Sequence, residues 1–334
     1  MLSPARRKLR PADWGLGMTL CLASIASNGK GIVAVSDFKL DLASASGEGQ
    51  PKWGRLNKWW AAMYAGPEVS NATSVMEHVA EALEVFDEAG KRADRSDVEK
   101  MFQSEMQNAL NKAIEARVLS LYSGMTVKQF VDTGLRKLGP EAFGELRQQM
   151  AAVTLGYEFL VFGFDSKCDP HLVHVQERAE PKAKNVMGFW AIGSGDISAW
   201  NSLFFHNYQK ELPLRSAAYY LCAAKFVSEG AGLGPGTDVA CLMKDGRLIG
   251  IDVAAIRRLW AKSGRPKIPK NLWNRMPPYK PIEGRLKTSD DRPPIHLSSI
   301  PSGHRLFSPS ISQEGPPIHK SPKRGRKDRP ASQE

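Results

Sequence analysis

Residues 18–23 read Met-Thr-Leu-Cys-Leu-Ala and residues 31–37 read Gly-Ile-Val-Ala-Val-Ser-Asp, and these two runs decide the fold. In the first run Leu20 and Leu22 alternate with the other residues at the two-residue period of a β-strand. Residues 27–31, Ser-Asn-Gly-Lys-Gly, have the composition of a turn. The stretch therefore predicts two adjacent strands, the second of which ends at Asp37.

Strand and helix patterns follow one another in blocks along the rest of the chain. The predicted strands cover residues 59–65, 159–163, 171–175, 189–192, 238–243 and 247–253, and the predicted helices cover residues 76–86, 96–114, a segment from Thr126, 197–208 and 214–227. Ser96 and Glu99 form a capping-box pattern, and residues 43–50 read as a polar loop. This order predicts an α+β protein with two antiparallel sheets stacked between helix layers, a four-layer αββα sandwich.

The net charge of +11 belongs mainly to one end of the chain. Residues 261–334 hold sixteen Lys and Arg against six Asp and Glu, a net of +10, together with thirteen of the 22 prolines. A segment this poor in apolar side chains predicts a disordered tail. Its run 320–329, KSPKRGRKDR, could contact nucleic acid, but a solvated linker is the commoner role of such a run. This leaves residues 18–260 as the folded domain and residues 1–17 as an irregular extension.

The remaining composition is that of a soluble protein, with 42 % hydrophobic and 24 % charged residues. No apolar run is long enough to cross a bilayer, and the basic start lacks the apolar core of a secretory signal. Cys21, Cys168, Cys222 and Cys241 form no Cys-x-x-Cys pair. We therefore expect reduced thiols, a cytoplasmic location and no membrane contact.

Two histidines raise the question of a metal site. His171 and His174 are three residues apart on a predicted strand, so we expect their side chains on opposite faces. No third ligand is apparent beside them, and a zinc site is not predicted.

The opening runs resemble the start of proteasome β-type subunits, and most of all the bacterial proteasome-related proteins that begin Met-Thr-x-Cys. In that family a strand that opens with threonine is followed by a turn and by an apolar strand that ends in Ala/Ser-x-Asp. Later segments agree in order: Lys52 before a strand ending at residues 64–66 (Tyr-Ala-Gly), residues 191–195 (Ala-Ile-Gly-Ser-Gly), residues 236–240 and residues 244–246. The resemblance spans about residues 18–255 and implies the sandwich fold of N-terminal-nucleophile (Ntn) hydrolases.

The resemblance implies a role for each matched position. Thr19 would be the nucleophile, Lys52 would lower the pKa of its hydroxyl as a nearby cation, and Asp37 would hold Lys52 charged. The backbone N–H of Gly66 would face the oxyanion, and Ser194 would steady the Thr19 amine and a bridging water. These roles describe a threonine-type endopeptidase that works through an ester on Thr19 and needs no metal or organic cofactor.

A threonine hydroxyl is a weak nucleophile and needs an adjacent base. The α-amine of a terminal Thr19 could serve, because its ordinary pKa of about 7.7–8.0 leaves part of it neutral at cellular pH. We therefore expect translation to start at Met18, the methionine to be removed, and residues 1–17 to be a misassigned extension. Self-cleavage of a propeptide is the alternative, but family members that use it cut between Gly and Thr, whereas this chain reads Gly17-Met18-Thr19.

Two positions late in the domain depart from the family pattern. The family has an aspartate after its long helix, and Glu229 is the nearest candidate for it here. The serine that follows in the family has no match in residues 231–233.

Tyr64 takes the position that lines the first substrate pocket of the family. A tyrosine there would favour a substrate with a modest apolar side chain.

Two other functions remain open on the sequence. One is a structural proteasome-like subunit without a free threonine, and the other is an Ntn amidohydrolase that acts on a small acylated molecule. Relatives assemble into rings that hide their sites, so the resemblance implies a homo-oligomeric ring. It also implies a peptide substrate and makes an ATPase or unfoldase a candidate partner.

Overall fold

The structure, a computed structural model, describes residues 19–37, 39–42, 45–48, 52–66, 69–122, 124–229, 233–263 and 280–281. All of these belong to the first of two units, Met1–Asp291, and none belongs to the second, Arg292–Glu334. The predicted extension 1–17 and nearly all of the predicted tail 261–334 lie outside the described residues.

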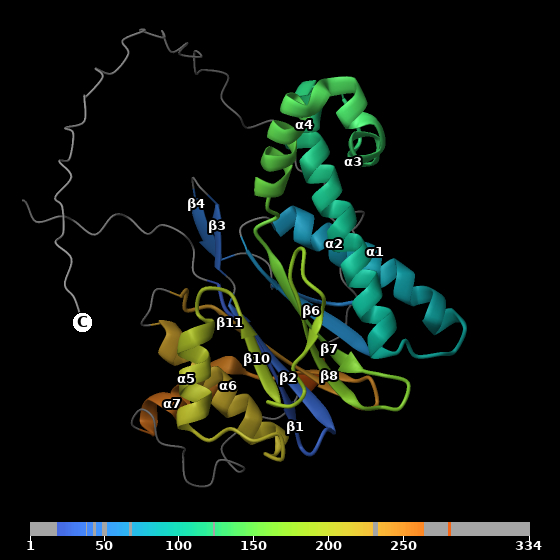
Figure 1. Cartoon of the computed structure of the whole chain (residues 1–334). Coiled ribbons are helices and arrows are strands. Elements are labelled where there is room, and N and C mark those ends of the chain that lie inside the picture. The colour runs from blue at the N-terminus through green and yellow to red at the C-terminus, as the bar shows by residue number, and fades with distance from the viewer. Residues whose placement is uncertain are drawn as a thin grey trace, which may run out of the picture. The chain divides into compact units, whose positions relative to one another are not determined.

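The described elements follow the block order that the sequence predicts (Figure 1). The strands are β1 Cys21–Ala26, β2 Gly31–Asp37, β3 Lys39–Leu42, β4 Ala45–Glu48, β5 Trp53–Arg55, β6 Trp60–Ala65, β7 Glu158–Phe164, β8 Pro170–Val175, β9 Lys182–Ala183, β10 Phe189–Ile192, β11 Thr237–Met243, β12 Leu248–Gly250 and β13 Lys280–Pro281. The helices are α1 Val69–Glu88, α2 Arg95–Arg117, α3 Val127–Gln129, α4 Leu135–Ala152, α5 Asp196–Phe205, α6 Leu214–Glu229 and α7 Val253–Lys262, with a 3₁₀ turn at Leu119–Tyr122 and a π-helical turn at Phe130–Gly134.

One sheet contains the predicted opening strands at its centre. Its order is β10-β1-β2-β11-β12-β13, and every neighbouring pair is antiparallel. Cys21 pairs with Ser36 on β2 and with Ile192 on β10. Therefore the beginning of β1, the end of β2 and the end of β10 all reach the same edge of the sheet.

The second sheet has the order β5-β6-β7-β8-β9 and is also antiparallel throughout. Strands β3 and β4 form a separate two-stranded hairpin. The α+β class and the two antiparallel sheets of the prediction are thus confirmed.

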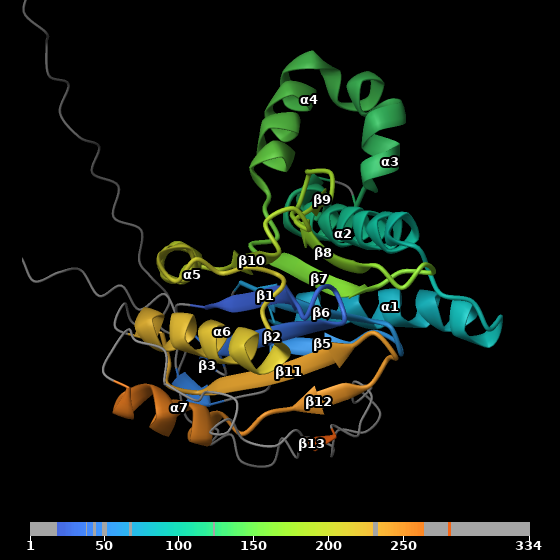
Figure 2. The same ribbon diagram turned by 90° about the horizontal axis from the view of Figure 1, so that it is seen from below.

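Three apolar clusters show how the two sheets and the helices pack. The side chains that alternate along β1 separate cleanly, with Leu20 and Leu22 in a cluster with helices α5, α6 and α7, and Cys21 and Ala23 in a cluster between the sheets. The third cluster joins the outer face of the second sheet to helices α1, α2 and α4. Strands therefore lie between two groups of helices, as Figures 1 and 2 show from two directions.

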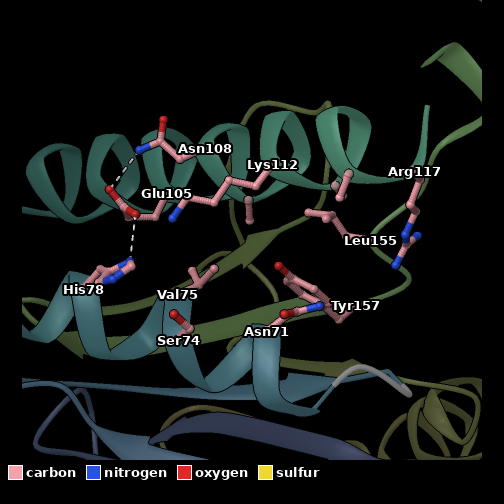
Figure 3. Close-up of a pocket in the computed structure, with 13 residues that line it drawn as sticks. Asn71, Ser74, Val75, His78, Glu105, Asn108, Lys112, Arg117, Leu155 and Tyr157 are labelled. Atoms are coloured by element: carbon pink, nitrogen blue, oxygen red, sulfur yellow. Dashed lines mark hydrogen bonds and ion pairs between the residues drawn. The ribbon is translucent and has the colours of Figure 1, made fainter. Parts of the chain in front are cut away.

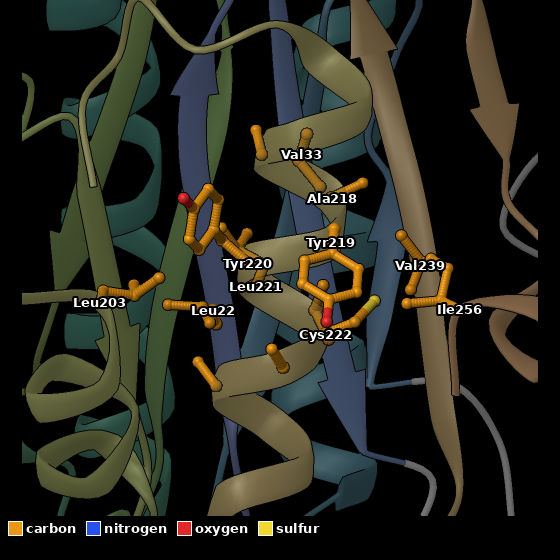
Figure 4. Packing of buried hydrophobic residues seen from close by; sticks show 14 of the residues in the cluster. Leu22, Val33, Leu203, Ala218, Tyr219, Tyr220, Leu221, Cys222, Val239 and Ile256 are labelled. Atoms are coloured by element: carbon orange, nitrogen blue, oxygen red, sulfur yellow. The ribbon is translucent and has the colours of Figure 1, made fainter. Parts of the chain in front are cut away.

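Helix α6 is buried along most of its length because small residues let it lie close to the first sheet. Ala218, Leu221 and Cys222 face strand residues such as Leu22 and Val33, and Leu203 and Ile256 close the flanks (Figure 4). The face of β1 that carries Leu20 and Leu22 therefore packs on α6, close to Thr19, which precedes that strand.

Four predictions need correction. Residues 251–253 are not strand: Asp252 caps α7 by accepting a hydrogen bond from Ala255 N–H at 3.2 Å, and the helix places Ile256 in the core. Helix α2 begins at Arg95 with Asp94 and Asp97 as its capping pair, so Ser96 and Glu99 are already inside it. The polar loop 43–50 includes strand β4, and residues 280–281 of the tail add strand β13 beside β12.

Because the core between the two sheets is tightly packed, removal of a large side chain from it should lower stability strongly. Phe162 is fully buried there, and Phe162→Ala should lower the free energy of unfolding by about 3–5 kcal/mol, because a cavity remains. Urea or guanidinium unfolding measures this. Val85→Ala, at an exposed site of α1, is the matched control and should change little. An unchanged stability for Phe162→Ala would contradict the packing described.

Candidate active site

The topology gathers residues that are distant in sequence at one edge of the first sheet. Thr19 precedes β1, Asp37 ends β2, and Ser194 follows β10 by two residues. Hydrogen bonds pin this edge: Asp37 N–H donates to the carbonyl of Leu20 at 3.1 Å, and Gly195 N–H donates to the carbonyl of Thr19 at 3.2 Å.

All the polar atoms of Thr19 have partners at this edge. Its N–H donates to Ser194 Oγ at 3.1 Å, and its hydroxyl accepts a hydrogen bond from Lys52 Nζ at 2.8 Å. Thr19 is 7 % exposed, whereas Ser194 is exposed. Thr19 is thus held inside the protein, and the side chain that contacts its nitrogen borders solvent.

Lys52 is the hub of the site. Its ammonium lies 2.8 Å from Thr19 Oγ1 and 2.9 Å from Asp37 Oδ1, and both Lys52 and Asp37 are buried. Burial raises the pKa of the Asp37 carboxyl, and Lys52 opposes this rise. A buried cation that contacts both a carboxylate and a hydroxyl stabilises the negative charge that develops on that hydroxyl when it loses its proton.

The second sheet positions Lys52, because Lys52 directly precedes edge strand β5. The Lys52 carbonyl accepts from Tyr64 N–H at 3.0 Å, and the Cys21 thiol donates to the Tyr64 carbonyl at 3.2 Å. Trp53 also donates its indole N–H to Asp238 on the first sheet. Both sheets therefore determine the distance between Lys52 and Thr19.

Gly66 lies next to the same edge, and its backbone requires glycine. Its φ is +141°, and a Cβ added there would lie 2.3 Å from the Gly156 carbonyl oxygen. A Cβ added at Gly193 would lie 2.4 Å from the Thr19 carbonyl oxygen and 3.2 Å from Ala65 Cβ. Because the same point at Gly193 is close to both Thr19 and Ala65, Ala65 and the turn that it begins lie near Thr19, while the oxyanion role of the Gly66 N–H stays a prediction.

Glu229 is bound by two cationic side chains. Its carboxylate binds Arg257 through two hydrogen bonds of 2.6 and 2.7 Å and accepts one from Lys225 Nζ at 2.6 Å. Burial raises the pKa of Glu229, but the hydrogen bonds from Arg257 and Lys225 outweigh it and hold the pKa below its usual value. Both oxygens are occupied by these two cations, so Glu229 anchors the end of α6, and a role for it beside Thr19 stays a prediction.

Tyr64 faces the helix side of the second sheet. It is 4 % exposed and belongs to the cluster with α1 and α2. Burial raises the pKa of its phenol to about 12. Its backbone links Cys21 and Lys52, and its role in substrate preference stays a prediction.

The sequence interpretation missed a carboxylate at this edge. Glu158, the first residue of β7, accepts from Gly193 N–H at 3.0 Å and lies 2.6 Å from His174 Nε2.

The two histidines of β8 lie on opposite faces of the strand, as expected. His174 contacts Glu158, whereas His171 contacts Asp165 at 2.9 Å. No group of three or more His, Cys, Asp or Glu side chains within the described residues could hold a metal ion.

A cavity of about 280 Å³ with a mixed polar and apolar lining lies elsewhere, between α1, α2 and the segment before β7 (Figure 3). At one end of it the Glu105 carboxylate contacts His78 and accepts a hydrogen bond from Asn108, and Tyr157 lies toward the other end. Thr19, Asp37, Lys52 and Ser194 do not line this cavity. The site at the sheet edge and this cavity are therefore separate.

Comparison with known proteins gives no indication of function. No protein-family model matches the chain, and no curated protein matches it.

In the part of the chain described here, no helix is both long and apolar enough to cross a membrane.

The backbone conformation of Gly66 predicts that a side chain at this position would destabilise the protein. Gly66→Ala should lower the free energy of unfolding by at least about 1–3 kcal/mol, because alanine resists this φ and its Cβ meets Gly156. Gly144→Ala, in α4 with open space around it, should instead raise stability by roughly 0.5–1 kcal/mol. Thermal unfolding of both variants makes the comparison, and equal effects would contradict the geometry of the turn.

The anchor role of Glu229 predicts a loss of stability. Glu229→Gln should cost about 3–5 kcal/mol in chemical unfolding, because Lys225 is fully buried and loses its counter-charge. The lowered Glu229 pKa means that the wild-type advantage is complete above the ordinary glutamate pKa of about 4.3 and is lost as pH falls through the lower folded-state value. A stability difference that grows on acidification would contradict this assignment.

Proposed function

We propose that the protein is a threonine-type peptidase of the Ntn-hydrolase kind, with Thr19 as its N-terminal nucleophile. The observation that carries the proposal is the buried contact of Lys52 Nζ with Thr19 Oγ1 at 2.8 Å and with Asp37 at 2.9 Å. Two sheets between two groups of helices agree with a proteasome-like four-layer sandwich, and we propose that fold class on the same grounds.

The chemistry requires Thr19 to be the first residue of the mature chain. Its nitrogen would then be an amine instead of an amide, and Ser194 Oγ, 3.1 Å away, would accept one of its hydrogens and orient its lone pair. The neutral amine can take the hydroxyl proton, either directly or through one water.

The proposed reaction proceeds in two balanced steps. In the first, the hydroxyl proton moves to the Thr19 amine while Oγ1 bonds to the carbonyl carbon of the substrate. The carbon–nitrogen bond then breaks, and the proton passes to the departing amine. In the second step water adds to the ester carbonyl carbon and gives a proton to the Thr19 amine. The bond between that carbon and Oγ1 then breaks, Oγ1 takes the proton, and the acid product leaves.

The residues around Thr19 supply the electrostatic part of this mechanism. Lys52 stabilises the alkoxide character of Oγ1, and Asp37 compensates the charge of Lys52 in a buried setting. We propose that the Gly66 N–H donates to the oxyanion, since its turn lies beside Thr19 and its backbone conformation is fixed.

The remaining features of the proposal rest on the resemblance alone. The substrate would be a peptide, and the chains would form a homo-oligomeric ring in the cytoplasm with an ATPase or unfoldase as candidate partner. A structural, non-catalytic subunit is the second candidate, because the acidic residue expected beside Thr19, Glu229, is engaged with Arg257 and Lys225 instead.

Substitutions at Thr19 test the proposal directly. In protein with a confirmed Thr19 N-terminus, Thr19→Ala should abolish cleavage of a fluorogenic peptide panel, whereas Thr19→Ser should retain part of the activity because it keeps a hydroxyl. Lys52→Ala should reduce kcat by about 10²–10³-fold, as expected when a group that stabilises developing charge is removed. The acid limb of kcat/KM should lie near the ordinary amine pKa of about 7.7–8.0.

The outcomes separate the candidates. Cleavage that persists in Thr19→Ala would overturn the assignment of the nucleophile. A free Thr19 without hydrolysis of peptides or small amides would favour the structural subunit, and hydrolysis of small amides alone would favour an amidohydrolase. Thr133→Ala, in the π-helical turn, where its hydroxyl donates only to the Gln129 carbonyl, serves as a matched control and should leave kcat unchanged.

A further inference from the structure

The carboxylate of Glu158 contacts three groups that have no role in the proposed mechanism. Its Oε1 accepts from Gly193 N–H at 3.0 Å, and its Oε2 lies 2.6 Å from His174 Nε2 and accepts from Gln176 Nε2 at 3.3 Å. Glu158 pairs in register with Ala65 on β6, directly before Gly66. It therefore stands between the two turns that flank Thr19.

The turn that Glu158 holds is the one that orients the Thr19 nitrogen. Gly193 has φ +91°, a conformation that favours glycine, and its N–H donates to Glu158. The next two residues both contact Thr19, Ser194 through its hydroxyl at 3.1 Å and Gly195 through its N–H at 3.2 Å. A shift of this turn would move the Ser194 hydroxyl away from Thr19.

We propose that Glu158, braced by His174, is a positioning residue that fixes the Gly193–Gly195 turn and so holds Ser194 at the nucleophile's nitrogen. This inference rests on the proposed function for its catalytic consequence. Glu158 acts through Gly193 and Ser194, and its own oxygens are already engaged by protein donors.

The surroundings of Glu158 favour a charged acceptor. Burial raises the pKa of Glu158, but the hydrogen bonds from His174 and from Gly193 N–H outweigh it, so the pKa lies below its usual value. The His174 ring contacts the Trp190 ring, 5.8 Å between centroids, and Lys184 lies over Trp190. A carboxylate braced in this way makes a stronger hydrogen bond to a backbone N–H than a neutral group would.

The test compares two near-isosteric replacements, expressed from the natural gene and purified after maturation. Glu158→Met keeps the length of the side chain but cannot accept from Gly193, whereas Glu158→Gln keeps an amide oxygen that can. For Glu158→Met we expect kcat to fall about 10- to 100-fold, since small displacements of catalytic groups have effects of that size, with KM changed less than about twofold. Glu158→Gln should restore most of kcat.

Hydrogen exchange at the Gly193 amide provides a readout that needs no activity. Exchange should be markedly faster in Glu158→Met than in the wild type, and should stay slow in Glu158→Gln. Gln176→Ala removes only the longer contact to Oε2 and is the matched control, expected to behave as the wild type. If Glu158→Met does not fold, Glu158→Ala replaces it in both measurements.

A folded Glu158→Met with a protected Gly193 amide, or with wild-type kcat in an active enzyme, would overturn the inference. If the wild type with a free Thr19 proves inactive, the proposed function fails. The exchange data then still decide whether Glu158 holds the turn.

Discussion

The Lys52 ammonium is buried between the carboxylate of Asp37 and the hydroxyl of Thr19. This contact depends on the relative position of the two sheets, because each sheet contributes residues to it. A buried charge is costly unless its partners are close and well oriented, so the three side chains constrain one another. The first sheet supplies Thr19 and Asp37, and the second supplies Lys52 through β5. The backbone bonds through Tyr64 connect the two contributions.

Backbone geometry completes the site. Gly193 lets its turn approach Thr19 more closely than a Cβ would permit, and Gly66 likewise lets the neighbouring turn approach Gly156 and Tyr157. Helix α6 supports the sheet from behind, and its end is held by the cluster of Lys225, Glu229 and Arg257. The site is therefore built on packed strands and rigid turns, which suits chemistry that depends on fixed distances.

The sequence was informative where local pattern and motif order agree. Alternation along residues 20–25 separates the two faces of β1, and the motif order brings Thr19, Asp37, Lys52 and Ser194 together. Helix α7 was missed although Asp252 and the spacing of Ile256, Leu259 and Trp260 give a cap and an apolar stripe. The contact of Glu229 with Arg257 was missed because Arg257 is recognised as its neighbour only once α7 is placed. Glu158 could not be found, because its contact with His174 depends on the register of β7 and β8.

The identity of the first residue of the working protein tests the central claim most directly. Mass spectrometry of the intact protein from its natural cells, with sequencing of the N-terminal peptide, would measure it. The account predicts a mature chain that begins at Thr19 with an unmodified amine. A chain that still continues through Met18 would lock that nitrogen in a peptide bond and contradict the proposed hydrolase.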